Sequence, residues 1–489
     1  MRSCGVLMHI TSLPSPYGIG TLGKEAEKFA LWLKEAGQTY WQVLPIGPTG
    51  YGDSPYQPFS TFAGNPLLID LDALVEGSLV SRQLCENADF GADPNYVDYD
   101  KVSATRDIIL REAFKNFKED VGYNSFIIEE ESWLNDYALF TALKKAFGGK
   151  PWTLWDDDIK LRKPEAVAKY TGELADEIRY NKFVQYVFFK QWNAFRQFCN
   201  RNKIQLIGDI PIYVSPDCAD VWAQPELFEL DERRNPARVA GVPPDYFSAT
   251  GQLWGNPLYN WQEMKKTGYS WWIKRIRKTS ENFDMLRIDH FRAFDTYYAI
   301  PFGHKTAEHG TWENGPGMDL FNAVKNELGE VNIIAEDLGD IFDSVKVLLK
   351  NTGFPGMRVL QFGFNGENAD NDHIPHHYPE NCVVYTGTHD NATIVQWYRE
   401  ADSATKLMAK RYLKPRLFER INSCFIRWAY ASPARLAIIP MQDILGLGKE
   451  ARMNVPSTVG GNWNWRMKSG ANTSAKAAKL RNLAKIYFR

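Results

Sequence analysis

Four acidic residues each stand where a short apolar run of the sequence stops: Asp209, Asp289, Glu336 and Asp390. If these runs are parallel strands of one barrel, the four carboxylates converge on the same end of it. Carboxylates that share a pocket repel one another and raise the pKa of at least one of them, which a design for stability alone avoids. Two suffice for glycoside chemistry: one attacks the anomeric carbon, and the other protonates the leaving oxygen and later activates the incoming group. We therefore treat these residues as a candidate catalytic set.

The stretch FDMLRIDHFRAF, residues 283–294, places an arginine two positions before one of these acids. In a strand, this spacing turns Arg287 and Asp289 to the same face. An arginine this close keeps a carboxylate ionised and oriented, as a nucleophile requires. Taken alone, the pair favours a structural ion pair at a strand end. The similar stretches around Glu336 and Asp390 shift the interpretation towards catalysis, because a retaining pair needs carboxylates about 5–5.5 Å apart, a separation that adjacent strands can supply.

Eight apolar runs, most of them separated by helical patterns, predict the strands that position these residues. They cover residues 6–10, 40–46, 204–214, 285–289, 331–339, 356–364, 381–391 and 435–445. Eight strands alternating with helices are typical of an α/β fold closed into a (β/α)8 TIM barrel. Such a barrel takes about 250 residues, so roughly half of this 489-residue chain is expected to be insertion.

We expect a single catalytic barrel over residues 1–489, with insertions. A mainly helical insertion is predicted at 51–203 after the second strand, another insertion at 215–272 after the third, and a C-terminal loop and helix at 446–489. The last segment leaves no room for a C-terminal β-domain. Periodic apolar residues predict helices over residues 24–36, 104–117, 133–147, 178–202 and 473–486.

Composition argues against several classes of partner. The net charge is -2, so we expect neither nucleic acid nor an anionic membrane as a partner. No apolar run has the length of a transmembrane helix, and the N-terminus lacks the features of a signal peptide, which predicts a cytoplasmic protein. The six cysteines are widely spaced and predict neither disulfides nor a zinc site. The histidines of HIPHHYP, residues 373, 376 and 377, lack the carboxylates and strand context of a metal site and favour a solvated loop.

Several of these stretches resemble one enzyme family. LRIDHF, IIAEDLG and YTGTHDN are similar to the catalytic strand ends of the α-amylase clan. DSPYQPFSTFAGNP, GDIPIYV, GQLWGNPLYNW and VGGNWNWR are similar to motifs of one branch of that clan, the 4-α-glucanotransferases of the amylomaltase or disproportionating-enzyme type. The resemblance covers nearly the whole chain, and the expected absence of a C-terminal β-domain agrees with it.

The resemblance implies roles for the acidic residues. Asp289 is the implied nucleophile, which forms a covalent β-glucosyl-enzyme, and Glu336 is the implied general acid/base. Asp390 is implied to hold hydroxyls of the distorted sugar in the transition state. Asp209 resembles the clan's third-strand carboxylate, which orients the site. No cofactor or metal is required by this chemistry.

The remaining candidates are expected to bind substrate. Tyr56 is implied to stack under the sugar at the cleavage point, although a loop tyrosine is more often packing. Arg287 would keep the nucleophile anionic. His290 and His389 would donate to sugar hydroxyls, with strand-end hydrogen bonds as the alternative. Four loop residues are predicted to flank the groove and exclude water, with ordinary loop packing as the alternative: Gln252, Trp254, Asn462 and Trp463.

These features predict a transglycosylase that acts on α-1,4-glucans and maltooligosaccharides. It would pass the donor segment to the 4-hydroxyl of another glucan or of glucose. The alternatives are an α-glucan hydrolase that uses the same residues and a glucan-binding protein without activity. An aldolase-type barrel would need a Schiff-base lysine or a phosphate-binding glycine loop late in the barrel, and the sequence shows neither.

Overall fold

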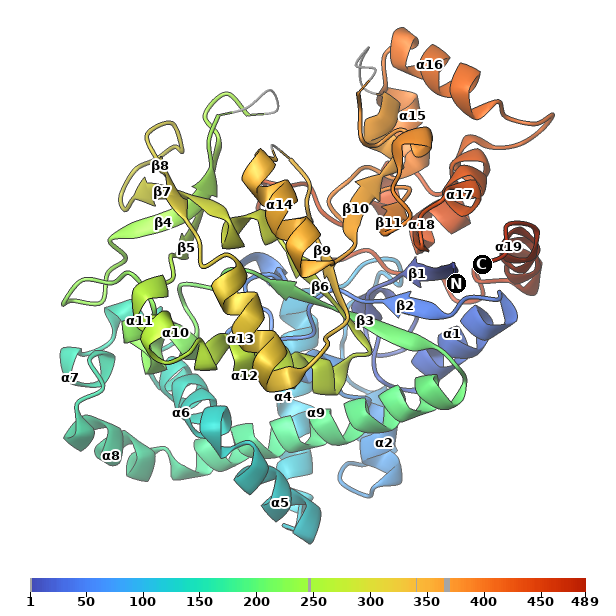
Figure 1. Ribbon diagram of the computed structural model, residues 1–489. Helices are drawn as coiled ribbons and strands as arrows, with labels where there is room; N and C mark the ends of the chain where they lie inside the picture. The colour runs from blue at the N-terminus through green and yellow to red at the C-terminus, as the bar shows by residue number, and fades with distance from the viewer. Residues whose placement is uncertain (1, 245–247, 340, 365–369) are drawn as a thin grey trace.

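The protein is described by a computed structural model that covers residues 2–244, 248–339, 341–364 and 370–489. Its centre is a closed barrel of eight parallel strands, in the order β1-β12-β11-β10-β9-β6-β3-β2 (Figure 1). The strands are β1 (Ser3–Leu7), β2 (Tyr40–Gln42), β3 (Gln205–Pro211), β6 (Met285–Asp289), β9 (Ile333–Ala335), β10 (Gly356–Val359), β11 (Cys382–Tyr385) and β12 (Leu436–Pro440). The predicted (β/α)8 barrel is therefore confirmed.

Helices follow most of the barrel strands and bury their apolar faces. They include α1 (Lys24–Glu35), α12 (Ser270–Asn282), α13 (Met318–Leu328), α14 (Asp343–Thr352), α15 (Ile394–Glu400), α16 (Ser403–Leu413) and α17 (Ile421–Ala431). After β12 the chain continues through the short helix α18 (Met441–Leu445) and a long loop to α19 (Ser474–Ile486). Helix α19 packs beside α1, and the two chain termini lie close together (Figure 1). No strand follows β12 in the part of the chain that the structure describes.

The segment between β2 and β3 is mainly helical. It holds α2 (Leu71–Glu76), α3 (Arg82–Glu86), α4 (Tyr99–Asn116), α5 (Val121–Glu129), α6 (Glu131–Ala146), α7 (Asp157–Lys160), α8 (Pro164–Glu173) and α9 (Ala175–Arg201). Helix α9 is 27 residues long and runs beneath the barrel, with α4, α5 and α6 packed against it (Figure 1). Its buried side chains are largely aromatic, which joins this segment and the barrel in one apolar core.

A second, antiparallel sheet lies beside the barrel and was not predicted. Its order is β5-β4-β7-β8, from β4 (Arg238–Val242), β5 (Gln252–Pro257), β7 (Thr296–Pro301) and β8 (Thr311–Asn314). The short helices α10 (Ala219–Ala223) and α11 (Trp261–Lys266) flank the first two strands in the sequence. Two separate excursions, one after β3 and one after β6, build this sheet together, so no local sequence pattern indicated the pairing.

Six of the eight predicted strands, all but the first and the fourth, were longer than the observed ones, and three of them show why. The third ends at Pro211, and proline cannot donate to a strand ladder. The sixth ends at Val359, where a 3-10 turn over Leu360–Phe364 begins, and the eighth ends at Pro440, where α18 begins. These extensions are mainly apolar and mostly buried, and an apolar run alone does not separate a buried strand from a buried helical turn.

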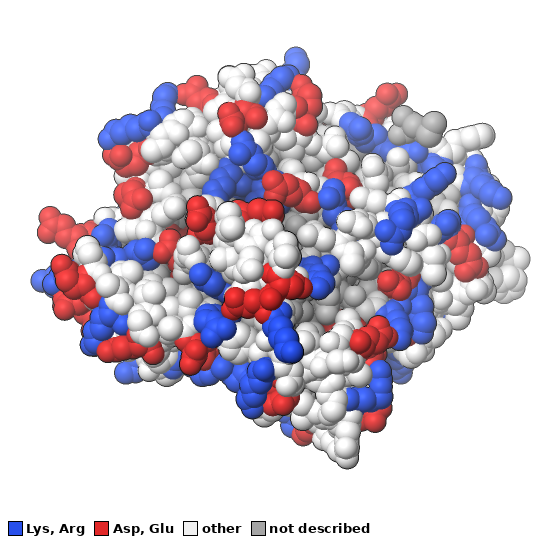
Figure 2. Space-filling view, turned by 90° about the horizontal axis from the view of Figure 1, so that it is seen from below, with Lys and Arg blue, Asp and Glu red and all other residues white. Residues whose placement is uncertain are grey.

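The surface and the cysteines add three observations. All six cysteines are buried and unpaired. Among the described residues, no helix combines the length and the apolarity needed to cross a membrane. On the face shown in Figure 2, lysine and arginine side chains are interspersed with aspartate and glutamate.

Candidate active site

The barrel brings the four acidic residues to one end. Asp209 lies within β3, Asp289 is the last residue of β6, and Glu336 directly follows β9. Asp390 lies in the loop after β11. Strands β6 and β9 pair in parallel with Ile288 opposite Ala335, so the next residues along the two strands are Asp289 and Glu336. The sequence prediction that these two residues lie on adjacent strands is confirmed.

Arg287 links two of the carboxylates. Its Nη1 donates to Oδ1 and Oδ2 of Asp209 at 2.8 and 2.7 Å, and its Nη2 donates to Oδ1 of Asp289 at 2.8 Å. Arg287 is only 3% exposed, so these bonds are shielded from water. The arginine therefore fixes the orientation of Asp289, which lines the cleft.

Glu336 is held by two backbone amides. The N–H of His290 donates to Oε2 at 2.7 Å, and the N–H of Leu338 donates to Oε1 at 2.8 Å. His290 has a φ of 53°, a left-handed conformation that is uncommon for residues other than glycine and is costly to hold. The turn directly after Asp289 thus supplies a hydrogen-bond donor to the neighbouring Glu336.

Burial and charge shift the pKa of Glu336 upwards. Burial is the larger cause and the negative charge of Asp289 the second, while Arg287 and the two backbone amides oppose them. The result is a pKa of about 7. Near neutral pH this carboxyl can therefore both give and take a proton, as a group acting as general acid and then base must.

Asp390 is stabilised as an anion. Asn454 Nδ2 donates to its Oδ1 at 2.7 Å, and His389 Nε2 lies 3.3 Å from its Oδ2. Burial favours a higher pKa, but the His389 charge, the hydrogen bonds from His389 and Asn454, and Arg287 outweigh it and lower the pKa of Asp390 to about 2. In return, Asp390 raises the pKa of His389 against the effect of burial. Asp390 is thus an anion and Glu336 a proton carrier at the same end of the barrel.

Aromatic rings form one wall of the site. The Tyr56 hydroxyl donates to Asp209 Oδ2 at 2.9 Å, while its ring stacks on His389 with centroids 5.0 Å apart and planes at 16°. The ring centroid of Trp463 lies 5.7 Å from that of Tyr56 and 5.8 Å from that of His389. On the other side, Trp254 meets His290 edge to face at 4.8 Å.

These residues line a cleft of roughly 1580 Å³ that includes space open to solvent. Of the twelve predicted site residues, the cleft wall holds Tyr56, Gln252, Trp254, Asp289, His290, His389, Asp390 and Trp463. Asp209, Arg287 and Glu336 lie beneath this wall and contact it. Asn462 does not line the cleft: its amide bonds Val455 N, Thr458 O and Thr458 Oγ1 within its own loop.

Two residues that hold Asp390 were missed by sequence reasoning. Besides Asn454, Arg452 contributes, because its Nη2 donates to the backbone oxygen of Asp390 at 2.9 Å. Both residues lie in the irregular loop after α18, more than 60 positions from Asp390. No strand or helix period marks them, so the sequence carried no signal for either.

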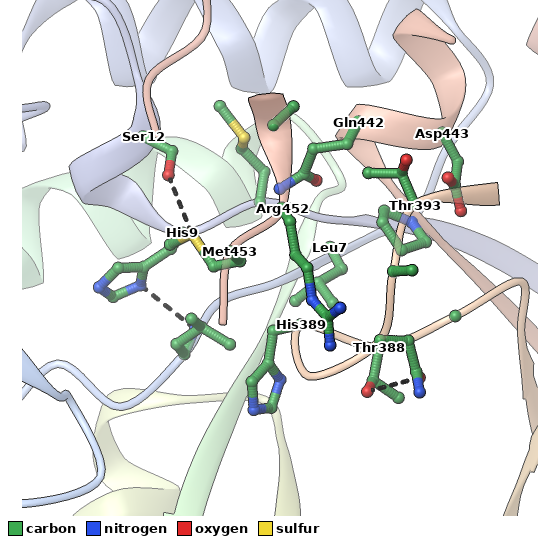
Figure 3. Close-up of a pocket in the computed structure, with 17 residues that line it drawn as sticks. Leu7, His9, Ser12, Thr388, His389, Thr393, Gln442, Asp443, Arg452 and Met453 are labelled. Carbon is green, nitrogen blue, oxygen red and sulfur yellow. Dashed lines mark hydrogen bonds between the residues drawn. The ribbon is translucent and has the colours of Figure 1, made fainter. Parts of the chain in front are cut away.

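A second pocket lies behind His389 and opens beside the loop that carries Asp390. Figure 3 shows His9, Arg452 and Met453 on one side of it and Thr388 and Thr393 on the other. The His9 Nδ1 accepts a hydrogen bond from Leu44 N at 3.3 Å, and burial lowers the pKa of His9 to about 3. His9 is therefore neutral near pH 7. No group of three histidine, cysteine, aspartate or glutamate residues suited to a metal ion occurs among the residues that the structure describes.

Comparison with known proteins places this site in a family. Residues 8–472 match the family described as 4-alpha-glucanotransferase. A 4-alpha-glucanotransferase of Clostridium butyricum is 47% identical over 99% of this chain and 100% of its own length, and one of Thermus thermophilus is 47% identical over 99% and 98%. The solved amylomaltase of Streptococcus agalactiae in complex with acarbose has a TM-score of 0.98, with 44% identity over the full length of both chains.

Proposed function

Because this chain belongs to the 4-alpha-glucanotransferase family, we propose that its barrel-end cleft cuts a 1,4-α-glucan and retains the donor segment on Asp289. The segment then passes to the 4-hydroxyl of an acceptor glucan or of glucose. The enzyme is a hexosyl-transferring transferase. The observation that carries the proposal is the pairing of Asp289 with a proton-carrying Glu336 on adjacent strands.

In the first half of the reaction, Asp289 attacks the anomeric carbon. Arg287 orients its carboxylate, and the side chain is 30% exposed towards the cleft. Glu336, protonated on part of the molecules near pH 7, gives its proton to the leaving glycosidic oxygen. The bond between the two sugars breaks, and a covalent glycosyl-aspartate forms.

In the second half, Glu336 acts as the base. It takes the proton of the acceptor 4-hydroxyl, whose oxygen attacks the anomeric carbon and releases Asp289. The two inversions together retain the α-configuration. Asp390 supports both steps, because an anion and its hydrogen bonds to ring hydroxyls stabilise an oxocarbenium-like centre as charge develops. Asp209 holds Arg287 and Tyr56 in place and does not react.

Transfer exceeds hydrolysis only if the acceptor is held better than water. We assign this task to the aromatic wall of Tyr56, Trp254 and Trp463 together with Gln252, whose Oε1 accepts a hydrogen bond from Trp254 Nε1 at 3.2 Å. Flat rings cover the apolar faces of pyranose units. His290 and His389 donate to sugar hydroxyls from either side of Asp289.

The substrates are α-1,4-glucans and maltooligosaccharides, as donors and as acceptors. The structure of the Streptococcus agalactiae relative in complex with acarbose supports this class of ligand. We propose further that the enzyme works in the cytoplasm without a cofactor or metal ion, and without nucleic acid or membrane as a partner, in keeping with its net charge of -2.

The experiment is incubation of the pure protein with maltotriose, followed by product sizes and total reducing ends. We expect glucose and a ladder of longer maltooligosaccharides at constant reducing ends. Rising reducing ends would replace the proposal with a hydrolase. An unchanged maltotriose that still binds would replace it with a glucan-binding protein.

A further inference from the structure

The loop that carries His389 and Asp390 runs between two buried anchor points, Thr386 after β11 and Ile394 at the start of α15. The residues between them form neither strand nor helix. Behind this loop lies the second pocket, with about 460 Å³ of space not occupied by protein atoms, part of it open to solvent (Figure 3). The loop therefore borders this pocket along its length, and side-chain hydrogen bonds hold it at both ends.

One side chain binds both anchor points. Asp443, in the first turn of α18, accepts a hydrogen bond from Thr386 Oγ1 at 2.6 Å through Oδ2. Its Oδ1 accepts one from Ile394 N at 2.8 Å. Residues 386 and 394 bracket Asp390, so a single carboxylate closes the loop at both ends. Figure 3 shows Asp443 at the edge of the pocket beside Thr393.

Asp443 is a buried acidic residue, which is uncommon in a protein interior. It is 2% exposed, and its carboxylate accepts from two neutral donors, Thr386 Oγ1 and Ile394 N. Burying a carboxylate without a cation costs desolvation free energy, and hydrogen bonds from two neutral donors offset only part of it. Helix α17 adds support from behind, since Asn422 Nδ2 donates to the Asp443 backbone oxygen at 2.8 Å.

On the other side of the loop, Gln361 Nε2 donates to Ala392 O at 2.6 Å, so residues after β10 and residues after β12 both bind this loop.

We propose that Asp443 is a positioning residue for the transfer reaction. It sets the positions of Asp390 and His389 in the cleft by holding both ends of their loop. Asp443 does not touch substrate. This inference rests on the role proposed above for Asp390.

The test compares three variants with the wild-type enzyme. Asp443→Ala removes both clamps, and we expect kcat to fall by about 100-fold, as a displacement of about 1 Å can cause, with KM changed by less than about threefold. Asp443→Asn should restore kcat to within about threefold of wild type. Its oxygen can accept from Ile394 N, and its NH₂ can donate to the Thr386 hydroxyl.

The control is Asp220→Ala. Asp220 is also buried and also accepts from one backbone amide and one threonine hydroxyl, Thr61 N at 2.9 Å and Thr61 Oγ1 at 2.8 Å, but it does not contact the 386–394 loop. We expect a similar loss of Tm in the two alanine variants, with kcat of the Asp220 variant within about threefold of wild type. A fall in kcat specific to Asp443→Ala therefore reports position rather than stability.

NMR titration of the His389 ring gives a readout that a purely structural role would not move. Asp390 raises the pKa of His389, so displacement of the loop in Asp443→Ala should lower that pKa, while Asp220→Ala should leave it unchanged. If Asp443→Ala does not fold, Thr386→Val replaces it, with lowered kcat and a lowered His389 pKa as the expected result.

The inference would be overturned if the Asp443 and Asp220 alanine variants had equal kcat and the His389 titration were unchanged. If Thr386→Val has to replace Asp443→Ala, wild-type kcat and a wild-type His389 titration in that variant would overturn it. Asp390→Asn separates this failure from that of the proposed function. If Asp390→Asn is inactive while Asp443→Ala is unaffected, only the positioning role is lost. If Asp390→Asn itself retains activity, the proposed role of Asp390 is lost with it.

Discussion

Arg287 holds the carboxylates of Asp209 and Asp289 in place and balances their negative charge. It is buried, and it donates three hydrogen bonds to Asp209 and Asp289. A lysine could not reproduce this fork of planar donors, because its ammonium is a point charge on a flexible stem. Loss of Arg287 would leave Asp209 buried without its cation, so we expect its variants to lose stability as well as activity.

Asp289→Asn isolates the nucleophile. Asparagine keeps the size of the side chain, and Arg287 retains its two bonds to Asp209, so we expect the Tm to stay within a few degrees of wild type. Turnover of maltotriose should fall by at least about 10⁴-fold, as removal of a nucleophile does in other covalent enzymes. Circular dichroism and product analysis check the two expectations. A pure, folded variant with near wild-type turnover would exclude Asp289 as the nucleophile.

The pH dependence follows from Glu336. Its pKa is raised to about 7, chiefly by burial and then by the charge of Asp289. Because the first step needs the protonated acid, kcat/KM should be level at pH values well below 7, reach half its maximum near pH 7, and approach a tenfold fall per pH unit at higher pH. Carbon NMR of labelled glutamate should show a lower Glu336 pKa in Asp289→Asn, where the like charge is gone. An unchanged or higher Glu336 pKa in that variant would contradict this electrostatic link.

At the scale of elements, the site combines regular strands with irregular loops. The acidic residues at strand ends could be predicted from the sequence, because the apolar run predicts the strand and the acidic residue marks where that run stops. Asn454 and Arg452 could not, since they reach Asp390 from a loop that no period describes. The antiparallel sheet of β4, β5, β7 and β8 was missed for the same reason: its pairing joins two excursions that are separate in the chain.

The loop over residues 455–463 is fixed by Asn462, whose amide makes three hydrogen bonds inside it. Five of its residues line the cleft: Pro456, Ser457, Thr458, Val459 and Trp463. We expect Asn462→Ala to loosen the loop and admit water, so that the ratio of hydrolysis to transfer rises several-fold while the Tm changes little. Reducing ends and free glucose, measured together, give this ratio.

The matched control is Asn381→Ala, which loses an amide hydrogen bond to Gly353 O at the opposite end of the barrel. It should leave the ratio of hydrolysis to transfer unchanged. If both asparagine variants shift the ratio alike, or neither does, the loop does not govern water exclusion.

At the scale of the whole molecule, we propose one catalytic barrel with the mainly helical insertion 51–203, a second insertion 215–272 and the C-terminal segment 446–489. The eight strands and their order of connection followed from the count of apolar runs, and the closed barrel confirms that count. The strand ends at Pro211, Val359 and Pro440 could not be predicted in this way, because most of the residues that follow them are also apolar and buried.

Closure of the barrel joins the first and last strands, and Arg489 supports that junction. Its guanidinium donates to backbone oxygens near the starts of β1 and β12, among them Ser3 O at 3.0 Å and Ala434 O at 2.9 Å. We expect Arg489→Met to lower the free energy of unfolding by about 2–4 kcal/mol, through backbone oxygens left without a donor. Urea denaturation measures this loss.

The same variant should keep wild-type kcat per folded molecule, since this junction lies at the end of the barrel opposite the cleft. Arg435→Met is the control, because Arg435 is exposed and its side chain bonds only Asn381 among the described residues. Equal stability of the two variants would show that Arg489 does not secure closure.

The most direct test of the central claim is to trap the covalent intermediate. Glu336→Gln should still form a glycosyl-enzyme from α-glucosyl fluoride, whose leaving group needs little acid assistance, but should release it slowly because the base is missing. Acid quenching, proteolysis and mass spectrometry would then locate the sugar. We predict one glucosyl unit on the peptide that contains Asp289, attached to that side chain. A glucosyl unit on any other residue, or consumption of the fluoride with a β-configured product and no labelled peptide, would contradict the mechanism.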